Sequence, residues 1–120
     1  MPVIKYNNSK GEKLSEGVER RLGYLKNIMI VAADFSNGPA AEMPAPHSHP
    51  HEQVGYMAEG EALIEIGNER TRLERGDIFL IPAGVPHTLQ VLSRVARIIE
   101  CFSPIREDFL RKLICRTGLP

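Results

Sequence analysis

The sequence has little that would place the protein in an oxidising compartment or against a charged partner. It contains two cysteines, Cys101 and Cys115, in no metal-binding or redox spacing, so both are expected to be reduced core thiols rather than a disulfide. Its 15 basic and 15 acidic residues cancel and form no run of like charge longer than a pair. A basic face for nucleic acid or for an anionic membrane is therefore not indicated.

Long apolar runs are absent as well. The opening stretch MPVIKYNNSKGEKLSEG has no hydrophobic region typical of a signal peptide, and no segment approaches the length of a membrane span. There is also no linker, internal repeat or low-complexity tract. We therefore expect a single cytoplasmic domain over residues 1–120, long enough to bury about two-thirds of its unfolded surface.

Short strand-like stretches bounded by turn residues fill most of the chain. Each is apolar or alternates apolar with polar residues, and the spacing of about eight to twelve residues is typical of a sandwich or barrel. The stretches are 27–35, 54–60, 61–67, 68–77, 77–84, 87–92 and 94–102. They predict an all-β barrel over about residues 27–102.

The tail is the one segment with a helical pattern. Ser103 can cap a helix, and Ile105, Phe109 and Leu113 recur at the i, i+4, i+8 spacing of a helix face. The sequence therefore predicts a C-terminal helix over about residues 104–117.

Three of the four histidines lie within five residues. His47, His49 and His51 occupy every second position, and on a strand such side chains point to the same face. Gln53 follows His49 by four residues, and His87 follows a proline-bounded turn. Imidazoles and an amide oxygen are a plausible ligand set for a first-row metal ion. The alternative is a solvated histidine tract with incidental metal affinity, with His87 an ordinary surface residue.

These residues resemble the two motifs of the cupin superfamily. The first motif corresponds to His47, His49, Gln53 and Gly60, and the second to Gly76, Pro82, Gly84 and His87. The sequence departs from the usual motifs at Ala41 and Val91, and at Gln53 where a glutamate is common. The resemblance implies a double-stranded β-helix (jelly-roll) barrel with a metal ion inside.

Gln53 has a chemical consequence. A neutral amide beside neutral histidines leaves the full charge of a divalent ion at the site, which favours an anionic ligand. It also fits poorly with the two-histidine, one-carboxylate set of iron oxygenases. The alternative is that Gln53 bonds a neighbouring loop and His51 takes its place as a ligand.

Two longer tracts, HSHPHEQVGY and ECFSPIREDFL, narrow the resemblance. They are similar to small single-domain cupins of the KdgF type, from pectin and alginate degradation, over roughly residues 18–110. The resemblance implies conversion of 4,5-unsaturated monouronates to 5-keto-4-deoxyuronate. It also implies one divalent ion (nickel, zinc, manganese, iron or cobalt), held by His47, His49, Gln53 and His87.

The same resemblance suggests three catalytic residues. Glu100 corresponds to an acidic residue that is usually aspartate and would move a proton, Phe102 to an aromatic wall for the sugar, and Arg106 to an arginine that binds the carboxylate. Ordinary alternatives stay open, since Glu100 could be a rim carboxylate, Phe102 a core residue and Arg106 a surface cation.

Other functions and partners also stay open. A dioxygenase or sugar isomerase could use the same barrel, and a non-catalytic ligand-binding or sensor cupin could hold a small anionic molecule without converting it. We expect no nucleic-acid or membrane partner. Because cupins of this kind usually pair, we expect a homodimer in which the segment MPVIKY adds a strand to the partner's sheet.

Overall fold

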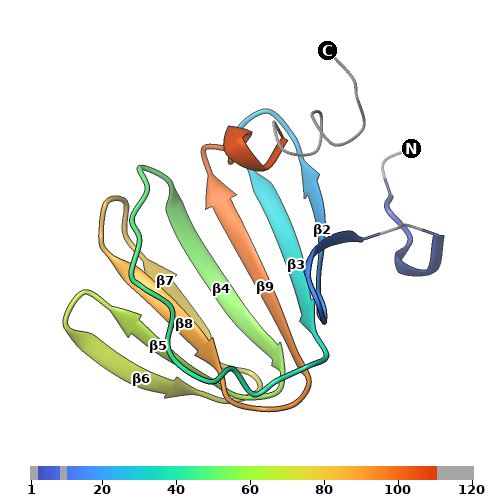
Figure 1. The fold of residues 1–120 in the computed structure, drawn as a ribbon. Coiled ribbons are helices and arrows are strands. Elements are labelled where there is room, and N and C mark those ends of the chain that lie inside the picture. Colours follow the sequence, from blue (N-terminus) through green and yellow to red (C-terminus); the bar gives the residue numbers. More distant parts are fainter. Residues whose placement is uncertain (1–2, 9–10, 111–120) are drawn as a thin grey trace.

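The computed structural model describes residues 3–8 and 11–110 (Figure 1). These residues contain a short 3₁₀ turn, η1 (Tyr6–Asn8), and nine strands. The strands are β1 (Glu12–Ser15), β2 (Val18–Tyr24), β3 (Met29–Phe35), β4 (Glu52–Glu59), β5 (Ala62–Ile66), β6 (Glu69–Leu73), β7 (Ile78–Ile81), β8 (His87–Val91) and β9 (Ala96–Ser103).

The strands form two antiparallel sheets that face each other (Figure 1). The larger sheet has the order β1-β2-β3-β9-β4-β7 and the smaller one the order β6-β5-β8. Strand β9, near the C-terminus, lies between β3 and β4, so the sheet order departs from the chain order as in a jelly roll. The predicted all-β fold is confirmed.

The main core lies between the two sheets. Ile64 of the small sheet packs in one buried cluster with Met57, Phe79 and Ile98 of the large sheet. Gly55 leaves room for this packing, because a Cβ atom there would lie 2.0 Å from the ring of Phe79. Burial of these side chains supplies the main free energy that holds the sheets together.

A second, smaller core lies toward the C-terminal end of β9. Met29, Val31 and Phe102 are buried there, and Phe109 packs against them from the last turn of the described chain. This cluster ties the tail to the end of the barrel where β9 finishes.

The N-terminal strands were not predicted from the sequence. The expected barrel begins near residue 27, whereas β2 already pairs with β3 along its whole length. The alternation of apolar and polar residues in the tract VERRLGY is broken because its fully buried position is Arg20, whose guanidinium bonds Glu12 with Nε–Oε1 at 2.9 Å. Paired with a carboxylate, a buried arginine can take the place of an apolar side chain.

A short helix begins at residue 107, within the predicted range, and continues to the last described residue, 110. The remainder of the predicted helix, and Cys115, lie outside the described residues. Cys101 has a free thiol. In the part of the chain that the structure describes, no helix is long and apolar enough to span a membrane.

Candidate metal centre

His47, His49 and His87 come together although 40 residues separate the first from the last. His47 and His87 form an isolated antiparallel bridge, with N–O distances of 3.0 Å and 2.9 Å in its two backbone hydrogen bonds. His49 lies beside this bridge, on the segment that leads into β4. One ring nitrogen from each of the three lies within 4.8 Å of the others, close enough to share one metal ion.

Backbone carbonyl groups fix which nitrogen of two rings is available. The Nδ1–H of His87 donates to the carbonyl of Val85 at 2.9 Å, so in the neutral ring Nε2 carries a lone pair. That Nε2 is buried and has no hydrogen-bond partner. A buried acceptor without a partner is costly, and a metal ion would satisfy it.

His49 and Gln53 also direct acceptor atoms, Nε2 and Oε1, toward each other. The Nδ1–H of His49 donates to the carbonyl of His51 at 3.1 Å, which leaves its Nε2 facing Oε1 of Gln53 at 3.0 Å. The amide is oriented by Glu100, whose carboxylate accepts a hydrogen bond from Nε2 of Gln53. The lone pairs of Nε2 and Oε1 therefore point toward each other, an arrangement that a bound cation would stabilise.

The residues present therefore fit a divalent ion. His47, His49 and His87 supply nitrogen donors, and the Gln53 amide directs an oxygen toward the same group. Burial is the main cause that lowers the pKa of both His47 and His87, with the positive charge of Arg106 adding to it. Both rings are thereby kept neutral near pH 7, the form that binds metal.

His51 lies outside the three-histidine cluster. Burial and the charge of Arg106 lower its pKa, and the backbone of Ile105 hydrogen-bonds its ring. Its ring lies edge-on to that of His49, with the ring centres 5.4 Å apart. His51 therefore connects the histidine segment to the C-terminal turn.

Glu100 lies on β9 at the inner face of the barrel, between Val31 of β3 and Gly55 of β4. It stands outside the histidine cluster and contacts it through Gln53. Burial raises the pKa of Glu100 to about 7, against the opposing effect of the Arg106 charge. The side chain of Gln53 therefore lies between the carboxyl group of Glu100 and the ring of His49.

Arg106 lies close enough to the histidines and to Glu100 for its charge to affect their pKa values. Its side chain is only 13% exposed. Its Nε and Nη2 donate to the two carboxylate oxygens of Asp108 at 3.0 Å and 2.8 Å. The guanidinium also lies over the ring of Phe109, 4.3 Å from its centre. Arg106 is therefore a fixed, carboxylate-binding cation and not a free surface residue.

Phe102 is 3% exposed and packs with Met29 and Val31. Its ring stands edge-on to His49, with the centres 5.8 Å apart. The structure thus shows Phe102 as a core residue beside the site, one of the two alternatives left open by the sequence.

The contacts of Asp108 and Phe109 with Arg106 were not predicted from the sequence. Both belong to the REDF stretch that follows the last strand. An aspartate two residues after an arginine at the start of a helix could have suggested the ion pair, whereas the stacking depends on the tertiary fold.

Comparison with known proteins agrees with this geometry. The cupin domain family model matches residues 36–100, which include both histidine segments and Glu100. The chain belongs to the cupin family.

Three proteins show how far the similarity extends along the chain. The pectin degradation protein KdgF of Dickeya dadantii is 31% identical over 101 residues, which is 82% of this chain and 89% of that protein. The structure of KdgF from Halomonas sp. has a TM-score of 0.78 at 28% identity, covering 88% of this chain and 94% of the other. The structure of an RmlC-like cupin from Shewanella frigidimarina has a TM-score of 0.81 at 31% identity, covering 91% of this chain and 96% of the other.

Proposed function

We propose that this protein is a metal-dependent cupin that opens 4,5-unsaturated monouronates to 5-keto-4-deoxyuronate. Two facts support the proposal: the similarity to KdgF, named as a pectin degradation protein, over most of both chains, and the chemistry of the inner face. The observation that carries it is that three histidine nitrogens, a carboxyl group and a guanidinium lie together at one end of the barrel.

In this proposal His47, His49, His87 and Gln53 hold one divalent ion. When bound, such an ion supplies a Lewis acid that binds and polarises an oxygen of an anionic substrate. Nickel, zinc, manganese, iron and cobalt all suit these donors. The chain's own contribution is to hold two of the rings in one tautomer through backbone carbonyls and to orient the amide through Glu100.

Arg106 binds the substrate carboxylate. A guanidinium group can donate two parallel hydrogen bonds to one carboxylate. In the free protein Arg106 makes these two bonds to Asp108. The Asp108 side chain is 41% exposed, so a substrate carboxylate can displace it toward solvent. The free protein thus keeps the fork oriented until substrate arrives.

Glu100 moves the proton. Ring opening breaks the bond between the anomeric carbon and the ring oxygen as the anomeric hydroxyl loses its proton, which leaves an aldehyde and an enol. The enol becomes a ketone when C4 gains a proton, so the overall reaction is an isomerisation with no other reactant. A carboxyl group on the inner face, beside the ligand set, is placed to accept and return that proton.

Phe102 acts on this site through His49. The edge of the Phe102 ring limits rotation of the His49 imidazole. Phe102 is itself held in place because it is buried in the smaller core. We therefore give Phe102 a positioning role rather than direct contact with the sugar.

The test is loss of the ultraviolet absorbance of the 4,5 double bond when metal-loaded protein is added to unsaturated galacturonate or guluronate. We expect decay with the metal-loaded protein and little above background after chelation. Binding of the uronate without decay would contradict the enzymatic proposal and support a sensor. Oxygen consumption during the assay would instead favour a dioxygenase.

A further inference from the structure

Phe109 contacts two guanidinium groups from distant parts of the chain. The guanidinium carbon of Arg106 lies 4.3 Å from the centre of its ring, and that of Arg20, on β2, lies 4.0 Å from the same centre. The ring of Phe102 meets that of Phe109 edge-on, with the centres 5.7 Å apart. The aromatic ring of Phe109 therefore links the large sheet to the arginine that the proposed function assigns to the substrate carboxylate.

The Arg20 end of this contact is buried. The side chains of Arg20 and Glu12 are each 7% exposed and form an ion pair between β1 and β2. The smaller core that Phe109 joins is built from apolar side chains, among them Met29 and Val31. A buried ion pair gives little net stability, because the cost of desolvation offsets the attraction between the charges. A role in holding the ring of Phe109 explains why a charged pair lies here.

Stacking and hydrogen bonding use different parts of the Arg106 guanidinium. Its N–H groups lie in the plane of the guanidinium, and two of its nitrogens donate to Asp108. The face of the group, by contrast, lies over the ring of Phe109. In the proposed function a substrate carboxylate replaces Asp108. The hydrogen bonds of Arg106 then pass to the substrate, whereas the contact with Phe109 can stay in place.

The charges around the ring are balanced. Arg20 is paired with Glu12, and Arg106 is paired with Asp108. Two cations can therefore contact one ring without a large repulsion between them. Both arginine side chains are largely buried, and the attraction between a cation and an aromatic ring is stronger where water is excluded. A substrate carboxylate in the place of Asp108 preserves this balance.

We propose that Phe109 is a positioning residue for Arg106, held in its turn by Arg20, and that it keeps the guanidinium oriented when a substrate carboxylate displaces Asp108. The inference rests on the proposed function, in which Arg106 binds that carboxylate. An oriented guanidinium loses less conformational freedom on binding than a mobile one, so the stacked ring strengthens binding without touching the substrate.

The first test separates the ring from its bulk in uronate kinetics. Phe109→Leu keeps an apolar side chain but removes the ring, so KM should rise about 3–10-fold while kcat stays nearly constant. Phe109→Tyr keeps the ring and should retain the wild-type KM. Phe35→Leu is the matched control, because Phe35 packs against the main core and lines the cavity at the far end of the barrel. Its KM should not change. A wild-type KM in Phe109→Leu, or an equal rise in Phe109→Tyr, would overturn the proposal.

The second test needs no turnover. Nitrogen–proton NMR detects the side-chain Nε–H of an ordered arginine, and zinc suits the measurement because it has a filled d shell. The Arg106 signal is identified by its loss in Arg106→Lys. We expect this signal in wild type, in Phe109→Tyr and, at a shifted position, in Asp108→Asn, but broadened or lost in Phe109→Leu. Loss in Asp108→Asn with retention in Phe109→Leu would show that the carboxylate positions Arg106 and would overturn the proposal. A wild type without the signal would do the same.

The two tests distinguish this inference from the proposed function. If the metal-loaded wild type neither converts nor binds the unsaturated uronate, the proposed function fails, whereas the NMR result still decides whether Phe109 orients Arg106. If the wild type is active and Phe109→Leu keeps both the wild-type KM and the wild-type Arg106 signal, the proposed function stands and the positioning role is wrong.

Discussion

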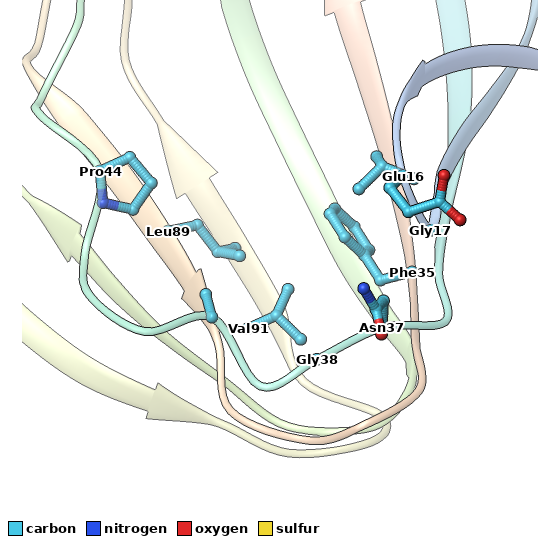
Figure 2. Close-up of a pocket in the computed structure, with 10 residues that line it drawn as sticks. Glu16, Gly17, Phe35, Asn37, Gly38, Pro44, Leu89 and Val91 are labelled. Atoms are coloured by element: carbon cyan, nitrogen blue, oxygen red, sulfur yellow. The ribbon is translucent and has the colours of Figure 1, made fainter.

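The two ends of the barrel use the same strands but differ in what they place inside. On β8 the inward positions run from His87 to Leu89 and Val91, and on β4 they run from Gln53 to Met57. At the far end from the histidines, Leu89 and Val91 line a cavity with Phe35 and Pro44, beneath the loop that follows β3 (Figure 2).

The difference shows which end is built for chemistry. The far cavity is mostly apolar, with Glu16 and Asn37 also among its lining residues (Figure 2). The histidine end buries ring nitrogens, an amide and a carboxyl group, which cost free energy unless each finds a partner. Since His87 Nε2 has none, the histidine end is organised for a polar or metal ligand, whereas the far cavity offers mainly apolar side chains.

The largest effect should come from Glu100. Glu100→Gln removes the proton but keeps the shape, so we expect kcat to fall by about 10²–10⁴-fold with little change in KM. Uronate kinetics measure both. The exposed Glu69 at the start of β6 provides the control, because Glu69→Gln should leave both constants unchanged. A Glu100→Gln variant as fast as wild type would place the proton transfer elsewhere.

A smaller effect is expected at Arg106. Arg106→Lys keeps the charge but loses the fork, and Arg106→Ala loses both. Since the contact is made in ground and transition states alike, KM should rise about 10–100-fold for alanine, with a lesser rise for lysine and a nearly constant kcat. An equal fall of kcat in both variants, with KM unchanged, would argue against carboxylate binding.

The smallest effect is expected in the packed core. Ile98 is 2% exposed in the main cluster, so Ile98→Val should lower the free energy of unfolding by about 0.5–1.5 kcal/mol. Denaturant titration measures this. Metal content and kcat should not change, and a loss of either would mean that the core and the site are not separable in this way.

Local spacing predicted the all-β fold, whereas the resemblance to the cupin motifs implied the histidine cluster. Strand alternation and turn residues mark β3 to β9, and the two cupin motifs bring His47, His49 and His87 to one place. What the sequence did not predict depends on tertiary partners. The fully buried residue of β2 is Arg20, which bonds Glu12, and the guanidinium that pairs with Asp108 also stacks on Phe109.

Metal content after dialysis tests the central claim most directly. Purified protein is equilibrated with each candidate ion, dialysed and analysed for metal per chain. We predict one divalent ion per chain in wild type and a large loss of it in His49→Ala, whereas His51→Ala should retain the ion because His51 lies outside the cluster. A wild type that retains no ion, or a His49→Ala variant that retains a full equivalent, would contradict the account.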